Sequence, residues 1–163
     1  MAEPSRVRLR PMTQDEYVAW REQSVRDYAA DIATSRDLEP AAAQAQSAGE
    51  FAQLLPDGLA SPDMHLWTAV VDEGAGDEAV GIGWFELRQR ASGVSAWIYD
   101  ISLDPARRGQ GLGRGLLDAL HDAARDLGAT SMTLNVFGDN RTAIRLYETA
   151  GYTVTAQQMR REL

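Results

Sequence analysis

The feature that most constrains the fold of this chain is a glycine-rich turn, residues 107–115, which contains four glycines and three arginines. The turn follows an apolar segment, 97–103, that is typical of a strand. It leads into residues 112–127, where leucines and alanines recur on one face of a predicted helix whose first residues belong to the turn. A second strand is predicted over 131–137. This strand, helix and strand form a crossover that places the two strands parallel and is almost always right-handed.

The remaining segments predict a mixed sheet in one domain. Alternation over 6–10 indicates a strand, and Thr13 with Glu16 has the spacing of a capping box at the start of a helix. A hairpin implies antiparallel pairing, and 163 residues suit one core. We therefore predict a single α/β (α+β) domain whose mixed central sheet has helices on both faces. Its further elements are helices at 13–34, 40–55 and 140–150, hairpin strands at 66–72 and 79–88, and final strands at 152–155 and 158–162.

The composition excludes several kinds of chemistry. The chain has no cysteine and two histidines, which argues against disulfides, thiolate zinc sites, cysteine nucleophiles and histidine-rich metal sites. All 16 cationic side chains are arginine, and the formal charge of −8 repels nucleic acid and anionic membranes. No apolar run approaches the ~20 residues of a membrane helix, and residues 1–6 do not resemble a secretion signal. We expect a cytoplasmic protein that binds neither nucleic acid nor a membrane.

The position of the glycine-rich turn favours an anionic ligand. A turn between a strand and a helix presents free backbone N–H groups, and glycines let the backbone approach a phosphate closely. The alternative is a connector with solvated arginines. The Walker pattern requires a lysine, which the chain lacks. The dinucleotide pattern G-x-G-x-x-G also fails, because its last position is Arg114 or Leu116.

Two motifs resemble the GNAT N-acetyltransferase superfamily. Arg108-x-x-Gly111-x-Gly113 is similar to its acyl-CoA pyrophosphate loop, Q/R-x-x-G-x-G/A. Residues 140–152 resemble its segment N-x-x-A-x-x-L-Y-x-x-x-G-F/Y. The resemblance is strong over 96–152, where it implies the acetyl-CoA-binding core. It is weak over 1–65, which would form the substrate-side strand and helices of a single GNAT domain spanning 1–163.

The resemblance implies acetyl-CoA as co-substrate, with no metal. In the family, the pantetheine arm enters a gap between the fourth and fifth strands and pairs with the backbone of the fourth, while the glycine turn wraps the pyrophosphate. Asn140 also fits a plain helix cap, and both roles can hold together. The residues that the resemblance assigns to the cofactor are Ile101, Ser102, Leu103, Arg108, Gly109, Gln110, Gly111, Leu112, Gly113, Arg114, Asn135, Asn140, Ala143 and Tyr147.

Acetyl transfer to an amine requires a neutral amine, a stabilised oxyanion and a proton for the departing thiolate. The family usually supplies this proton from a tyrosine at the position of Tyr147. A phenol, whose ordinary pKa is about 10, stays protonated at neutral pH. The alternative for Tyr147 is an ordinary core tyrosine. Because the chain has no cysteine, a route through an acyl-cysteine is closed, and we expect direct transfer in a ternary complex.

The general base has several candidates. Family members that carry a carboxylate or histidine at positions 97, 99 or 135 differ from this chain, which has Trp97, Tyr99 and Asn135. Asp100 lies in an otherwise apolar strand, where a carboxylate must be hydrogen-bonded, paired or shifted in pKa. It is a candidate for orienting or deprotonating the amine, and equally for a structural role. Glu86, or water activated by either carboxylate, is the other candidate.

The acceptor amine is less constrained by the sequence. Residues 1–63 contain eleven carboxylates and six arginines, and aromatic residues accompany them. This composition suits a cationic amine through charge attraction and cation–π contact, or it forms a solvated acidic surface over an aromatic core. The rival function is a degenerate GNAT domain that senses acyl-CoA without turnover, favoured by the missing carboxylates. Members of the family are often homodimers, and this is a further expectation for the chain.

Overall fold

The computed structural model describes residues 7–74 and 76–163. Two short 3₁₀ turns, Gly58–Ala60 and Pro105–Arg107, interrupt the loops. The longer elements, in chain order, are β1 (Arg8–Pro11), α1 (Gln14–Ser35), α2 (Pro40–Leu54), β2 (Met64–Asp72), β3 (Asp77–Arg90), β4 (Gly93–Leu103), α3 (Leu112–Asp126), β5 (Ala129–Leu134) and α4 (Arg141–Thr149).

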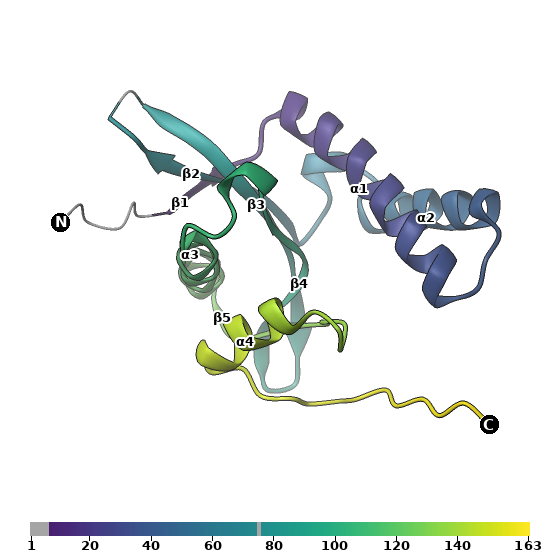
Figure 1. The fold of residues 1–163 in the computed structure, drawn as a ribbon. Coiled ribbons are helices and arrows are strands. Elements are labelled where there is room, and N and C mark those ends of the chain that lie inside the picture. Colours follow the sequence, from purple (N-terminus) through teal and green to yellow (C-terminus); the bar gives the residue numbers. More distant parts are fainter. Residues whose placement is uncertain (1–6, 75) are drawn as a thin grey trace.

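The strands form one mixed sheet in the order β1-β2-β3-β4-β5. The first four strands are antiparallel, and α3 carries the chain across so that β5 lies parallel to β4. Helices α1 and α2 lie on one side of the sheet and α3 on the other (Figure 1). The predicted mixed sheet with helices on both faces is confirmed.

Each face of the sheet has its own apolar core. Consecutive strand residues point to opposite faces, so Trp84 packs under α1 and α2 while Phe85 packs under α3. On the α3 side, Leu116, Leu117 and Leu120 are essentially inaccessible to solvent. A Cβ on Gly83 of β3 would lie 2.6 Å from a methyl carbon of Leu120. The close approach of β3 and α3 therefore requires glycine at this position.

Helix α1 begins as the sequence predicts. The Thr13 hydroxyl accepts a hydrogen bond from the Glu16 N–H, and the Glu16 carboxylate accepts one from the Thr13 N–H. Glu16 also accepts two hydrogen bonds from the Arg10 guanidinium and one from the Thr68 hydroxyl. Glu16, the third residue of the first turn, thus fixes the start of α1 against β1 and β2.

Several predicted boundaries differ from the structure. The fourth strand begins at Gly93, because a tight hairpin joins it to β3. The fifth strand ends at Leu134, so Asn135 lies beyond it. The predicted final strands are wrong: residues 153–163 form no strand, since no neighbouring strand pairs with them in the described part of the chain. Arg6 of the first predicted strand lies outside the described residues.

None of the helices in the described ranges combines the length and apolar character that crossing a bilayer requires.

Candidate active site

The strands β4 and β5 separate part of the way along the sheet. Their pairing runs from Val94 opposite Ala129 to Ile98 opposite Leu134, while β4 continues to Leu103. A bulge at Tyr99 accompanies the separation, because Trp84 and Phe85 of β3 pair with Asp100 and Ile98. Within the described residues, 99–103 therefore have no partner on the β5 side. This free edge suits an extended ligand with amide groups, such as a pantetheine arm.

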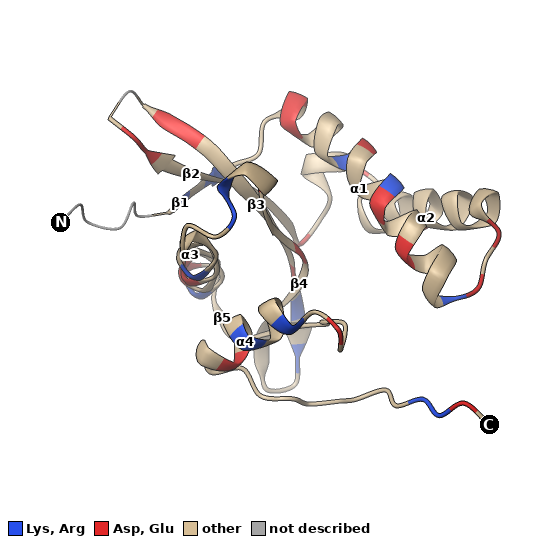
Figure 2. Cartoon of the chain, viewed as in Figure 1, with Lys and Arg blue, Asp and Glu red and all other residues tan. Residues whose placement is uncertain are grey.

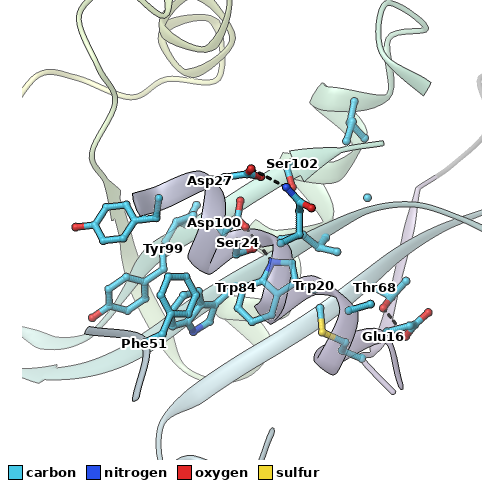
Figure 3. A pocket seen from close by; sticks show the side chains of 18 of the residues that line it. Glu16, Trp20, Ser24, Asp27, Phe51, Thr68, Trp84, Tyr99, Asp100 and Ser102 are labelled. Atoms are coloured by element: carbon cyan, nitrogen blue, oxygen red, sulfur yellow. Dashed lines mark hydrogen bonds between the residues drawn. The ribbon is translucent and has the colours of Figure 1, made fainter. Parts of the chain in front are cut away.

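A groove of about 1130 Å³ opens at this separation. Its cofactor side, as we name it, is lined by Ser102, Leu103, Asp104, Pro105 and Arg108, and the chain continues from there into the glycine turn, 109–114, which we include in the name although it does not line the groove. Its acceptor side consists of α1, α2 and the residues of β3 and β4 that face them (Figure 3). Among the predicted site residues, the structure brings five to the lining of this groove: Asp100, Ser102, Leu103, Arg108 and Asn135.

The glycine turn leaves the start of α3 open. Gly109 and Gly111 have φ angles of 73° and 77°, a region that side-chain-bearing residues rarely adopt. Gly111 is the N-cap and supplies no side-chain hydrogen bond, whereas the Thr13 hydroxyl caps α1 and the Asn140 side chain caps α4. The first N–H groups of a helix lack intrahelical partners and carry partial positive charge. The turn therefore fits a diphosphate.

The three arginines of the turn differ in their surroundings. Arg108 lines the groove, and its Nε donates to the Leu103 carbonyl. Arg107 is paired with Glu73 and Glu78. Arg114 donates to Asp118 and to the Thr149 carbonyl, which ties α3 to the end of α4. Arg108 is thus the arginine of this turn that is best placed to meet a ligand in the groove.

Three other residues predicted to bind the cofactor lie in or beside helices α3 and α4. Leu112 is buried in the core beneath α3, so only its N–H is available to a ligand. Asn140 is the N-cap of α4, and its Oδ1 accepts a hydrogen bond from the Ala143 N–H at 3.1 Å. The cap role of Asn140 is therefore present. Gly113 faces Leu146 of α4, with an added Cβ lying 3.6 Å from its methyl carbon, so α3 and α4 meet closely here.

Asp100 is held from the acceptor side. The indole N–H of Trp20, on α1, donates to its Oδ2 at 3.1 Å (Figure 3). Burial raises the pKa of this carboxyl, hydrogen bonds from Trp20 and Ser102 lower it, and the charge of Asp27 raises it further. The net shift is upward. A carboxylate whose pKa is raised is a better proton acceptor than an ordinary aspartate.

Tyr147 lies on the partly buried face of α4, beside Tyr152 at 5.6 Å between ring centroids. Burial raises the pKa of its phenol, and the charge of Asp100 raises it further. Its hydroxyl makes no hydrogen bond within the described part of the chain, whereas the Tyr152 hydroxyl is bonded to His121 at 2.9 Å. Tyr147 is not among the residues that line the groove. The raised pKa keeps this phenol protonated, and its hydroxyl has no hydrogen-bond partner among the described residues.

Glu86, the second candidate base, is already engaged. Its Oε2 accepts from the Arg88 guanidinium and from the Tyr99 hydroxyl, both at 2.8 Å. The Arg88 guanidinium also lies 4.4 Å from the Trp97 ring centroid. Glu86 does not line the groove. Its contacts favour the fixing of Tyr99 and Arg88 over direct proton transfer.

The acceptor side is aromatic and acidic. Trp84 meets Trp20 edge-on, with 5.4 Å between ring centroids, and stacks on Tyr99, with 4.5 Å between ring centroids. Acidic residues recur along α1 (Figure 2), and Asp27 and Asp31 of this helix line the groove. Asp27 accepts from Gln23 at 2.7 Å, and neither carboxylate forms an ion pair within the residues described.

Trp20 is the residue whose contribution the sequence did not reveal. Its helical spacing with Tyr17 predicts core packing, which is correct for the ring. Its N–H, however, reaches a carboxylate 80 positions away along the chain. The sequence offered one hint: a tryptophan that packs in a core usually places its N–H against a hydrogen-bond partner.

The free edge of β4, the open helix start and the groove define an acyl-CoA-dependent transferase, and comparisons with known proteins agree. The model of the acetyltransferase (GNAT) family matches residues 17–152. The chain belongs to this family and is an acetyltransferase, and such enzymes take the acetyl group from acetyl-CoA.

Two uncharacterized N-acetyltransferases of Bacillus subtilis are similar over nearly their whole length. YdgE is 34% identical, over 95% of this chain and 97% of its own. YycN is 33% identical, over 96% of this chain and 99% of its own. The crystal structure of YycN superposes with a TM-score of 0.87, covering 96% of this chain and 98% of that one. A putative acetyl transferase from Pyrococcus furiosus, 23% identical with a TM-score of 0.67, shares the fold.

Proposed function

We propose that this enzyme transfers an acetyl group from acetyl-CoA directly to a primary amine while both substrates are bound. The observation that carries the proposal is the groove itself. It joins the free edge of β4 and Arg108 to the Asp100 carboxylate and the aromatic acceptor side in one continuous space. A donor and an acceptor can therefore meet without a covalent enzyme intermediate. The cytoplasmic location expected from the sequence remains a prediction.

The cofactor side would bind the donor through backbone groups. The N–H groups of residues 109–113, with the Arg108 guanidinium, meet the diphosphate, and the free edge of residues 101–103 meets the pantetheine amides. Asn135 is the first residue of the loop that follows β5. Asn140, the N-cap of α4, is the last residue of the same loop. Acetyl-CoA, when bound, supplies a thioester whose acetyl carbon the amine attacks.

Two side chains would then move the protons. Asp100 orients the amine and accepts its proton, directly or through water, as the new C–N bond forms. Tyr147 holds the proton that the sulfur takes as the C–S bond breaks. The raised pKa values of both groups support these roles, because the carboxylate becomes more basic and the phenol stays protonated.

The acceptor that fits best is a cationic amine. Asp27 and Asp31 offer negative charge at the groove, and Trp20 and Trp84 offer aromatic faces and edges. Glu16 and Glu50 also line the groove, but each is paired with an arginine, Arg10 and Arg36. Asp27 and Asp31 therefore supply negative charge on the acceptor side that no arginine of the described residues pairs with.

A thiol-release assay across a panel of amines tests the proposal. We expect turnover with diamines and other amines that carry a second positive charge, and weaker turnover with amino acids of net negative charge. Initial rates with both substrates varied should give intersecting lines, as a ternary complex requires. Parallel lines, or saturable CoA binding with no turnover for any amine, would reject direct transfer, and the latter result would favour an acyl-CoA sensor.

A further inference from the structure

Two arginines of the described residues line the groove, and the proposed function gives a role to only one of them. Arg108 lies beside the glycine turn, where the diphosphate would bind. Arg88 lies on β3, on the same face of the sheet as Trp84, and so belongs to the acceptor side. A cationic amine has no use for a positive side chain in its own site. The guanidinium of Arg88 therefore points to another group on the acceptor.

A closed ring of hydrogen bonds holds this guanidinium in place. Its Nε donates to Glu86 Oε2 at 2.8 Å, and its Nη2 donates to the Tyr99 hydroxyl at 2.9 Å. The Tyr99 hydroxyl donates in turn to the same Glu86 oxygen at 2.8 Å. The guanidinium carbon also lies 4.4 Å from the centroid of the Trp97 ring. These contacts fix both the position and the plane of the guanidinium before any ligand binds.

The ring occupies one edge of the guanidinium and leaves another edge free. Nη1 has no acceptor among the described residues, and it is not one of the side-chain nitrogens that are buried without a partner there. Together, Nη1 and Nη2 carry a pair of parallel N–H bonds, which matches the oxygens of a carboxylate. Arg88 lines the groove and Glu86 does not, so a ligand in the groove can reach the free edge.

We propose that the free edge of Arg88 binds a carboxylate of the acceptor while the amine of the same molecule reacts beside Asp100. This inference rests on the proposed function, because it adds a second point of attachment to the same acceptor site. The acceptor is then an amine that also carries a carboxylate. Glu86 and Tyr99 are positioning residues, which act on the acceptor through the Arg88 guanidinium.

The register of the sheet sets the spacing between the amine and the carboxylate. Asp100 pairs with Trp84, and Arg88 lies four residues further along β3, a displacement of about 13 Å. The Arg88 side chain returns part of this way, because it bonds to the far end of the Tyr99 side chain. The amine and the carboxylate must therefore be separated by several bonds. An ω-amino acid meets this condition, whereas an α-amino acid does not.

Turnover of matched acceptors tests the proposal. Each ω-amino acid in a series of increasing chain length is compared with its own carboxamide, which keeps the amine and the length and removes the negative charge. The formal charge of −8 on the protein favours the cationic carboxamide, so a preference for the carboxylate requires a local site. We expect kcat/KM for the carboxylate to be higher by about tenfold or more at the best length.

Equal values at every length, or a preference confined to glycine over glycinamide, would overturn the proposal. Either result leaves the proposed function standing if the carboxamides are acetylated.

Two variants isolate the guanidinium. Removing Arg88 alone would leave the Glu86 carboxylate without its cation, and that charge would itself repel a carboxylate. The comparison is therefore between Glu86→Gln and the double variant Glu86→Gln, Arg88→Gln. From the first to the second, the ratio of kcat/KM for carboxylate over carboxamide should fall about tenfold or more. Circular dichroism checks that both variants are folded.

Arg90→Gln is the matched control for charge. Arg90 lies on the same strand and the same face, it is exposed, and it does not line the groove. Its removal should leave the ratio unchanged. An equal fall of the ratio in this variant would show a general effect of charge and would reject the site at Arg88.

An NMR titration with pentanoate, which has no amine, gives a readout that does not depend on turnover. In the CoA-bound enzyme, pentanoate should shift the indole N–H signal of Trp97, on whose ring the guanidinium lies, and pentanamide should not. The shift should persist in Glu86→Gln and disappear in the double variant. With this result, an enzyme that acetylates no amine would refute the proposed function and keep the carboxylate site. Turnover of amines without this shift would refute the carboxylate site alone.

Discussion

The two sides of the groove would bind their substrates by different means. The cofactor side offers backbone: two glycines with left-handed φ angles, an uncapped helix start and an unpaired strand edge. The acceptor side offers side chains from α1, α2, β3 and β4, among them Trp20, Trp84 and Asp100. A backbone site depends on a short local sequence, whereas a side-chain site depends on residues that only the fold brings together. Substitutions on the two sides should therefore affect different substrates.

Replacing Tyr147 by phenylalanine should have the largest effect. The change keeps the ring that packs beside Tyr152 and deletes the proposed proton donor. Positioned proton transfer contributes typically about 10²–10⁴-fold, so kcat should fall by a factor in that range. The Kd for CoA, measured by calorimetry, should change little, and the loss should shrink with donors that have better leaving groups.

Tyr152→Phe is the matched control for Tyr147. It removes a hydroxyl that bonds to His121, so it should lower the melting temperature while kcat is retained. A Tyr147→Phe enzyme with near-normal kcat would return Tyr147 to the role of a core tyrosine.

Replacing Asp100 by asparagine should separate the two sides. If the carboxylate orients or deprotonates the amine, kcat/KM for the amine should fall about 10²-fold or more while the Kd for acetyl-CoA is unchanged. The melting temperature, recorded in parallel, distinguishes catalysis from stability. A less stable variant whose folded fraction turns over normally would make Asp100 a structural residue.

Replacing Gly111 by valine should damage the cofactor side through the backbone alone. No atom lies within 4 Å of a Cβ built on Gly111, so the change introduces no clash, but its φ of 77° disfavours any side chain. The turn should rearrange, and the Kd for CoA should rise about tenfold or more.

The control for Gly111 is Gly128→Val at the other end of α3. Gly128 has a φ of 91° and equally open surroundings, so it carries a similar conformational cost. This variant should lose stability and keep its affinity for CoA. Equal losses of affinity in both variants would show that the turn has no special role.

Replacing Trp20 by phenylalanine should give a smaller and more specific effect. The indole hydrogen bond lowers the pKa of Asp100 against the effect of burial, so its loss should raise that pKa further. The acidic limb of kcat/KM should move to higher pH, with activity lost earlier as pH falls. An unshifted limb would mean that Asp100 is not the titrating base.

Replacing Glu16 by glutamine should affect stability rather than chemistry. The Arg10 guanidinium and the hydrogen bonds from Thr13 and Thr68 lower the pKa of Glu16 to about 2. A lowered pKa stabilises the fold above the ordinary carboxyl pKa of about 4.5, and this contribution disappears as pH falls toward 2. At pH 7 the variant should melt about 3 °C lower, and the difference should vanish near pH 2. A difference that persists at pH 2 would contradict this account.

The sequence alone determined the parts of this protein that depend on local patterns. The leucine face of α3, the capping box at Thr13 and the glycines of the turn each act within a few residues, so they predict the crossover, the mixed sheet and the open helix start. The family followed from two such motifs. The tertiary structure alone decided where β4 and β5 separate, that Asn135 lies beyond β5, and that Trp20 holds Asp100.

The C-terminal segment shows the same limit. Its residues favour strands, yet 153–163 form none, because a strand is completed by hydrogen bonds to a neighbour that the local sequence does not specify. Contacts between distant residues depend on how whole elements pack, and sequence periodicity reports only which face of an element is apolar.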